Sequence, residues 1–164
     1  MSFAGSDLSE AAGRGPRIAV GSDHSGFLMK RYLLRALAED FRATVIDCGC
    51  HGTDSVDYPD IAVAVGRAIQ ERRADCGVMI DGAGVGSTMA LNRLAGVRAA
   101  LCHDPFTTVN SRAHNDANVL VLGSSVVHPG EAVRLLRLWL RTPFEGGRHQ
   151  RRLDKIRALD GHGR

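Results

Sequence analysis

The chain has 164 residues, of which 44% are hydrophobic, and this is enough for one sizeable buried core and little more. Its formal net charge is +3, and the charge is unevenly placed. Residues 131–164 carry nine Arg or Lys against four acids, whereas the residues before them carry twelve against fourteen. The basic excess is therefore a property of the C-terminal segment.

No apolar run approaches the roughly 20 residues that span a bilayer, and the first residues lack the apolar core of a signal peptide. We therefore expect a cytoplasmic protein with no membrane partner. The cysteines, Cys48, Cys50, Cys76 and Cys102, lack the paired C-x-x-C spacing of zinc sites, and a chain of this size needs no disulfides. We expect reduced thiols and no metal.

In chain order, short apolar runs alternate with longer amphipathic stretches. Strands are expected at RIAVGS from residue 17, RATVIDCG from 42, CGVMI from 76, VRAALC from 97 and NVLVLG from 118. Helical periodicity covers 25–40, 59–73 and 104–115 between them. Near-continuous apolar strands separated by helices pair in parallel, with both sheet faces covered. We therefore predict a three-layer α/β domain around a five-stranded parallel sheet.

Two further helical stretches follow residue 129, GEAVRLLRLWLRTPF and GRHQRRLDKIRAL, and they predict a C-terminal helical extension. We expect one domain over residues 17–158. The flanking segments, 1–16 and 159–164, are expected to be flexible ends.

Ligands of such sheets bind beyond the carboxyl ends of the strands, so the residues that follow each strand are the most informative. Here they are rich in acids, bases and hydroxyl groups, in segments such as GSDHSG, DYPD, DGAGVG and HDPF. We expect one rim of the sheet to gather Asp23, His24, Tyr58, Asp81 and His103. Ordinary turns do not need so many acidic, basic and hydroxyl side chains, so this rim is a candidate functional site.

The segment DGAGVGS begins at Asp81, and its glycines Gly82, Gly84 and Gly86 let backbone N–H groups approach an anion at the start of a helix. A phosphate or an enolate oxygen would both suit. Ser87 stands where the dinucleotide fingerprint needs its last glycine, and no Lys-Ser or Lys-Thr pair follows a glycine, so both nucleotide motifs fail. Alternatively, the glycines only permit close packing of strand against helix.

The segment GRHQRR places Arg148 and Arg152 four residues apart, on one face of a helix. Two guanidinium groups together suit a phosphate or a carboxylate. The alternatives are a solvated basic face or a nucleic-acid patch, and the lack of interleaved aromatic residues argues against nucleic acid.

His114 offers acid–base capacity at the end of a predicted helix, and Asn115 beside it can donate to an oxyanion. Either residue could instead cap a helix or satisfy buried backbone. An acid, a base, an anion loop and paired arginines in one small domain favour an enzyme.

Six segments, GSDHSGFLMKRYL, SVDYPDIA, DGAGVGSTMALNR, GVRAALCHDPFT, AHNDANVLVLG and FEGGRHQRRLDKI, resemble in order and spacing the type B ribose-5-phosphate isomerases. That family also holds the galactose-6-phosphate isomerase subunits. The resemblance covers residues 17–157 and implies a Rossmann-like domain that forms homodimers or tetramers. It also implies an active site shared between subunits, and cofactor-independent interconversion of aldose and ketose phosphates through a cis-enediol.

Carried onto this chain, the resemblance implies that His114 opens the sugar ring. Asn115 and the backbone N–H groups of the glycine loop would hold the developing oxyanion, the loop residues being Gly82, Gly84, Val85 and Gly86. The pocket for the sugar would be lined by Asp23 and Tyr58. The phosphate would be held by His24, Arg148 and Arg152.

Three positions depart from the family pattern. Asp81 stands where many members have a cysteine as the enolising base, Ala83 replaces a threonine, and Ser125 replaces an arginine that contacts phosphate. A carboxylate is ionised at neutral pH without help, whereas a thiol must be activated, so Asp81 can serve as the base. Some actinobacterial members also use a carboxylate, from the position of Ser87.

We therefore expect a sugar-phosphate isomerase, with ribose 5-phosphate and ribulose 5-phosphate as the default pair. The changes at Ala83 and Ser125 leave open another sugar phosphate, of four or six carbons, or a keto-sugar acid. A sugar-phosphate-binding protein without turnover, in which Asp81 only binds a hydroxyl, is the alternative from a different class.

Overall fold

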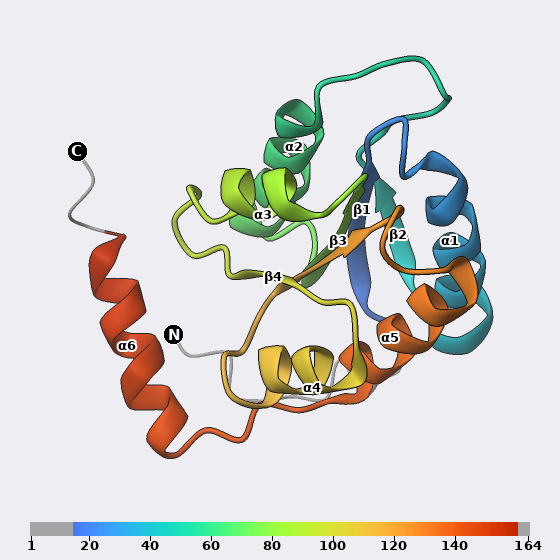
Figure 1. Cartoon of the computed structure of the whole chain (residues 1–164). Coiled ribbons are helices and arrows are strands. Elements are labelled where there is room, and N and C mark those ends of the chain that lie inside the picture. Colours follow the sequence, from blue (N-terminus) through green and yellow to red (C-terminus); the bar gives the residue numbers. More distant parts are fainter. Residues whose placement is uncertain (1–14, 161–164) are drawn as a thin grey trace.

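The computed structural model describes residues 15–160, and its five strands form one sheet (Figure 1). They are β1 (Arg17–Ser22), β2 (Thr44–Asp47), β3 (Cys76–Asp81), β4 (Ala99–Leu101) and β5 (Val119–Gly123), in the order β2-β1-β3-β5-β4. Each pair of neighbouring strands runs in parallel. The predicted five-stranded parallel sheet is confirmed.

Helices cover both faces of this sheet. They are α1 (Phe27–Phe41), α2 (Tyr58–Gln70), α3 (Val85–Leu91), α4 (Pro105–Ala113), α5 (Pro129–Arg141) and α6 (Arg148–Leu159). On one face α5 lies between α1 and α4, and on the other α2 packs against α3 (Figure 1). The predicted three-layer, Rossmann-like α/β class is confirmed.

Strand β1 shows why these apolar runs become strands. Successive side chains of a strand point to opposite faces of the sheet. Ile18 and Val20 therefore enter the core beneath α1 and α5, while Ala19 between them enters the core beneath α2. Because both faces are buried, the run stays apolar at every position.

The carboxyl ends of β1 and β3 lie side by side at the centre of the sheet. These strands are neighbours, but the chain leaves β1 toward β2 on one side and leaves β3 toward β4 on the other. Such a reversal of direction is where ligands bind in open α/β sheets. Asp23 follows β1 and Asp81 ends β3, so both predicted site residues lie at this point.

His114 lies at the opposite end of the strands. We call this end, where the strands begin, the amino edge of the sheet, and the end with Asp23 and Asp81 its carboxyl edge. Helix α4 runs back from the carboxyl end of β4 to the amino end of β5, and His114 follows its last turn. The C-terminal helix α6 stands apart from the sheet and from the helices that cover it (Figure 1). The predicted C-terminal helical extension is present.

The expected flexible ends concern mainly residues 1–14 and 161–164, which lie outside the described residues, and the single domain over 17–158 stays a prediction. Within residues 15–160, no helix is long and apolar enough to cross a membrane. All four cysteines are free thiols, as expected.

Candidate active site

Asp81, the last residue of β3, is buried, with 4% of its surface exposed. Its Oδ1 accepts the N–H of Gly84, and its Oδ2 accepts both the hydroxyl of Ser87 and, at 3.0 Å, the N–H of Ser87. Hydrogen bonds to an ionised acceptor are among the strongest in proteins. Three donors from the same loop therefore fix this carboxylate at the start of α3.

The glycine loop thus already holds one anion, which is its own aspartate. The N–H of Gly84 was expected to face a ligand, and it donates to Asp81 instead. Within residues 15–160, no acceptor pairs with the N–H groups of Gly82, Ala83, Val85 and Gly86. Those four donors are the part of the loop that can meet an oxyanion.

Two of the glycines leave room for their neighbours in different ways. Gly84 has φ +79°, and a Cβ there would lie 2.3 Å from Leu101 Cδ1, so both its conformation and its packing exclude a side chain. Gly86 has an ordinary helical conformation, but a Cβ there would lie 2.4 Å from Cζ of Tyr58. The phenol of Tyr58 therefore lies directly against the glycine loop.

Asp23 is held next to this loop. Its N–H donates to the carbonyl of Ile80 in β3 at 3.0 Å. Its Oδ1 accepts the hydroxyl of Ser25 at 2.6 Å and the N–H of Gly26 at 2.9 Å. Asp23 is 7% exposed, so this second carboxylate at the carboxyl ends of β1 and β3 is also buried and fixed.

His24 follows Asp23, and its Nδ1 accepts the N–H of Val56 at 3.3 Å. The neutral ring therefore carries its proton on Nε2 and can act as a donor without being charged. Tyr58 begins α2, reaches Gly86 of the glycine loop and is 38% exposed. His103, also expected at this rim, lies beside Asp104 at 3.4 Å on an exposed surface.

The loop after β5 is tied to the glycine loop through the backbone. The N–H of Ser124 donates to the carbonyl of Asp81 at 2.8 Å, and the N–H of Ser125 donates to that of Gly82 at 2.9 Å. The side chain of Ser125 is exposed. This residue therefore braces the loop with its backbone.

At the amino edge, His114 is held in one orientation and one tautomer. Asn110 Oδ1 accepts from the amide of Asn115 at 3.0 Å, so the Asn110 amide nitrogen is the group that faces His114 Nδ1 at 2.9 Å. Nδ1 is then the acceptor, and the neutral ring carries its proton on Nε2. Nε2 lies 3.5 Å from the carboxylate of Glu145.

His149, in the first turn of α6, stacks on His114 with ring centroids 4.1 Å apart and planes within 7° of parallel. Its Nε2 accepts the Nε–H of Arg148 at 3.4 Å and lies 3.8 Å from Glu145. Desolvation by burial, together with the nearby His114, Arg148 and Arg152, lowers the pKa of His149 below its ordinary value. The ring is therefore neutral at physiological pH.

His114, Glu145 and His149 bring three potential metal ligands within 4.8 Å of one another. The arrangement does not suit a metal, because ring nitrogens bind metals in the plane of the ring and these two planes are parallel. Arg148 also donates to the nitrogen that a metal would need. The cluster therefore fits proton transfer and anion binding better than metal binding.

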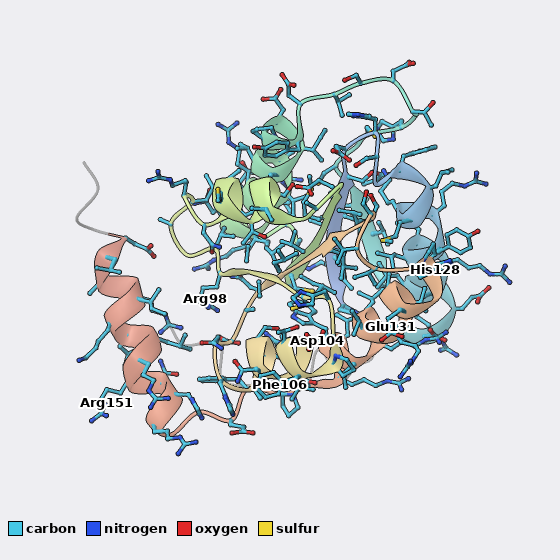
Figure 2. The ribbon with its side chains drawn as sticks, in the orientation of Figure 1. Arg98, Asp104, Phe106, His128, Glu131 and Arg151 are labelled. Atoms are coloured by element: carbon cyan, nitrogen blue, oxygen red, sulfur yellow. The ribbon has the colours of Figure 1, made fainter. Side chains whose placement is uncertain are left out.

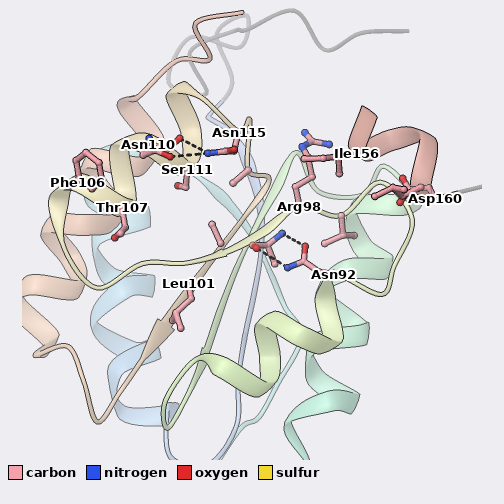
Figure 3. Close-up of a pocket in the computed structure, with 15 residues that line it drawn as sticks. Asn92, Arg98, Leu101, Phe106, Thr107, Asn110, Ser111, Asn115, Ile156 and Asp160 are labelled. Atoms are coloured by element: carbon pink, nitrogen blue, oxygen red, sulfur yellow. Dashed lines mark hydrogen bonds between the residues drawn. The ribbon is translucent and has the colours of Figure 1, made fainter. Parts of the chain in front are cut away.

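A pocket of about 580 Å³ lies beside this cluster, between α4, the edge strand β4 and α6 (Figure 3). Its wall includes the apolar side chains of Phe106, Leu101 and Ile156. Asn115, which Figure 3 shows hydrogen-bonded to Asn110, is the one predicted site residue that lines it. The pocket is therefore lined by neither the predicted base, Asp81, nor the predicted ring-opening residue, His114.

The sequence profile described as Ribose/Galactose Isomerase matches residues 18–156. The chain belongs to this family. It is 41% identical over 144 residues to the Escherichia coli (strain K12) protein named ribose-5-phosphate isomerase B, a match that covers 88% of this chain and 96% of the relative.

Solved structures of the ribose/galactose isomerase family have the same fold. Ribose-5-phosphate isomerase B of Clostridium thermocellum superposes with a TM-score of 0.87 at 40% identity, covering 89% of this chain and 98% of that one. The Mycoplasma genitalium enzyme, solved with bound ribulose-5-phosphate, gives a TM-score of 0.83 at 37% identity, covering 88% and 96%. The family resemblance read from the sequence is confirmed.

Within one chain, the residues that the family resemblance implies fall into two groups. The carboxyl edge brings together Asp23, His24, Tyr58, Asp81 and the glycine loop. The amino edge gathers His114, Asn115, Arg148 and Arg152. The parallel sheet separates the two groups, so a single chain does not assemble them.

The structure adds residues that the sequence analysis did not single out as site residues. Ser87 holds Asp81, Ser25 holds Asp23, and Glu145 and His149 contact His114. The sequential proximity of Ser87 and Ser25 to the acids was a usable signal. The contact of His149 with His114 links positions 35 residues apart and had no signal in one sequence.

Proposed function

We propose that this chain is a sugar-phosphate isomerase that interconverts an aldose phosphate and a ketose phosphate, by default ribose 5-phosphate and ribulose 5-phosphate. Family membership supports this, as does the ribulose-5-phosphate bound in the Mycoplasma genitalium relative. The observation that carries the proposal is the buried carboxylate of Asp81, fixed by three donors beside Asp23 and Tyr58.

Asp81 would act as the base. A carboxylate offers about four lone-pair positions, and three are used by Gly84 and Ser87, so one remains for a carbon-bound proton. Asp81 takes the proton from carbon 2, and the electron pair moves onto the carbonyl oxygen of carbon 1. That oxygen gains a proton, the oxygen on carbon 2 loses one, and Asp81 returns its proton to carbon 1.

The enediolate would be stabilised by preorganised donors. The free N–H groups of the glycine loop are aimed by the turn at the start of α3. The side-chain amide of Asn115 donates to the carbonyl oxygen and to Oδ1 of Asn110, so it would join them by exchanging one of these hydrogen bonds for one to the oxyanion. The reaction moves only protons between carbon and oxygen, so it needs no electron carrier. We therefore propose a cofactor-independent enzyme.

The phosphate would be held by His24, Arg148 and Arg152. Neutral His24 can donate from Nε2 while its Nδ1 keeps the hydrogen bond to Val56. The two arginines lie on successive turns of α6 and provide the positive charge.

We propose that the functional unit is a homodimer, or a tetramer built from such dimers. His114, Asn115, Arg148 and Arg152 of one subunit would complete the site around Asp81 of the other. Two features support this arrangement. The two groups of residues lie at opposite edges of the sheet, and large apolar side chains near the edge strand are exposed, with Phe106 at 78% and Met89 at 66%. A closed two-fold assembly would bury such a surface.

Incubation with substrate in deuterated water tests the chemistry. We expect wild-type protein to place deuterium on the carbon next to the carbonyl, and Asp81→Asn to abolish the exchange, because an amide cannot accept the proton. Asp40→Asn is the control. It removes a carboxylate from a surface ion pair with Arg137, at 2.6 Å, and should exchange like wild type. Exchange that persists in a folded Asp81→Asn protein would remove Asp81 from the role of base.

The alternatives make different predictions in the same assay. If Ala83 and Ser125 reflect a different sugar phosphate or a keto-sugar acid, exchange should appear with that sugar and not with ribose 5-phosphate. A binding protein without turnover would gain thermal stability with a sugar phosphate and show no exchange with any sugar. Ser125 favours the first alternative, because its exposed hydroxyl cannot replace the charge of an arginine.

A further inference from the structure

His149 connects two parts of the proposed site that come from different elements. We propose that His149 is a positioning residue that sets the proposed ring-opening histidine, His114, and a proposed phosphate-binding arginine, Arg148, at a fixed separation. The inference rests on the proposed function for the roles of these two neighbours. It assigns His149 itself no contact with substrate.

The first contact is the stack on His114. The two ring centroids lie 4.1 Å apart, and the ring planes are within 7° of parallel. The His114 ring is also held by the hydrogen bond from Asn110 to its Nδ1 at 2.9 Å. A stacked ring restricts tilting of the imidazole, and a hydrogen bond restricts its rotation. Together the stack and the hydrogen bond fix the direction of the N–H bond at Nε2 of His114.

The second contact is the hydrogen bond from Arg148. Its Nε–H donates to His149 Nε2 at 3.4 Å, which orients an otherwise exposed guanidinium on the first residue of α6. An arginine always donates, so Nε2 must be the acceptor and His149 must carry its proton on Nδ1. Only the neutral ring in this tautomer can hold Arg148.

The surroundings of His149 keep it in that state. The charged or titratable groups facing it are His114 from the end of α4, Glu145 from the preceding loop, and Arg148 and Arg152 from α6 itself. His149 is 4% exposed, and burial is the largest cause of its lowered pKa. Three of the four neighbours oppose a positive charge on this ring.

The consequence is a fixed distance between the His114 ring and the Arg148 guanidinium group. His114 would act at the ring oxygen of the sugar and Arg148 at its phosphate, and one buried imidazole contacts both. His149 would thereby match the site to the distance between ring oxygen and phosphate in the substrate.

Two substitutions separate the two contacts. His149→Phe keeps a ring for the stack and loses the acceptor, so KM for the sugar phosphate should rise about tenfold while kcat stays within about twofold. His149→Gln keeps an acceptor oxygen at the same reach and loses the ring, so kcat should fall about threefold to tenfold with little change in KM. Gln150→Ala, one residue along α6, is the matched control and should change neither constant. Equal effects of both His149 variants on both constants, or no effect of either, would overturn the proposal.

A spectroscopic measurement tests the inference without turnover. In wild-type protein at pH 7, the ¹⁵N shifts of His149 should show a protonated Nδ1 and a bare Nε2, whereas His114 should show the opposite tautomer. His149→Phe should weaken binding of inorganic phosphate, and His149→Gln should broaden or shift the His114 signals. A His149 proton on Nε2 would contradict the inference whether or not the protein isomerises sugars. Absence of isomerase activity with the expected tautomers would instead refute only the proposed function.

Discussion

At the scale of single residues, Asp81 combines two tasks that are usually divided. It is the proposed base, and it is also the acceptor that closes its own loop through Gly84 and Ser87. The side chains of Asp81 and Ser87 touch in this chain. A carboxylate at either of these two positions would therefore reach the same place beside the glycine loop.

The two constrained glycines should respond differently to alanine. Gly84→Ala puts a side chain at φ +79° against Leu101, so it should lower the free energy of unfolding by at least about 1–2 kcal/mol. Gly86→Ala displaces only the end of the Tyr58 side chain, so stability should change by less than about 1 kcal/mol while KM rises. Urea unfolding and steady-state kinetics on both variants check this. Equal losses of stability would show that Tyr58 is not free to move.

At the scale of elements, the strands were predictable and the helix contacts were less so. The central strands β3 and β5 are buried at every position and read as continuous apolar runs, whereas the edge strands β2 and β4 are only partly buried. Helix α3, by contrast, has seven residues and follows a loop whose shape depends on the side chain of Asp81. The sequence also indicated that α6 exists, but a polar helix with two buried positions, His149 and Leu153, does not say which surface it meets.

The arginines of α6 offer a test at this scale. Arg148→Gln and Arg152→Gln should each raise KM for a sugar phosphate about tenfold to a hundredfold, because each removes a charged hydrogen bond to the phosphate. Arg151→Gln is the matched control, since Arg151 points away from the rest of the chain (Figure 2) and should leave KM unchanged. Equal effects of all three substitutions would indicate a diffuse attraction of the basic helix rather than a phosphate site.

At the scale of the whole molecule, the topology of the sheet separates the proposed base, Asp81, from the proposed ring-opening residue, His114. Asp81 ends β3 and His114 precedes β5, so they lie at opposite ends of the strands, because β3 and β5 are parallel neighbours. The positions of the two residues relative to the predicted strands were sufficient to derive this separation, although the sequence analysis above did not state it. The surface that would bind a second copy of the chain could not be predicted from the sequence. Exposed apolar residues such as Phe106 have no periodic pattern that distinguishes them from core residues.

Mixing two inactive variants tests the shared site. Asp81→Asn and His114→Ala homodimers should both be inactive on a pentose phosphate, whereas unfolding and refolding them together should restore about a quarter of wild-type activity. Half of the randomly formed dimers are mixed, and each mixed dimer contains one intact site. Asp81→Asn mixed with the double variant should restore nothing. Inactivity of mixed dimers whose formation is verified by mass would place the whole site within one chain.

The separation of Asp81 and His114 within a chain also bears on which sugars need His114 of a second subunit. A pentose phosphate exists mainly as a closed ring, and an enzyme must open it before a carbon-bound proton can be removed. A four-carbon aldose with its phosphate on the terminal oxygen has no hydroxyl left to close a five-membered ring, so it arrives already open. Demand for His114 would thus be set by the substrate: an acyclic sugar phosphate would need Asp81 of one subunit and the phosphate-binding arginines of the other, and only a cyclic sugar would need His114 as well.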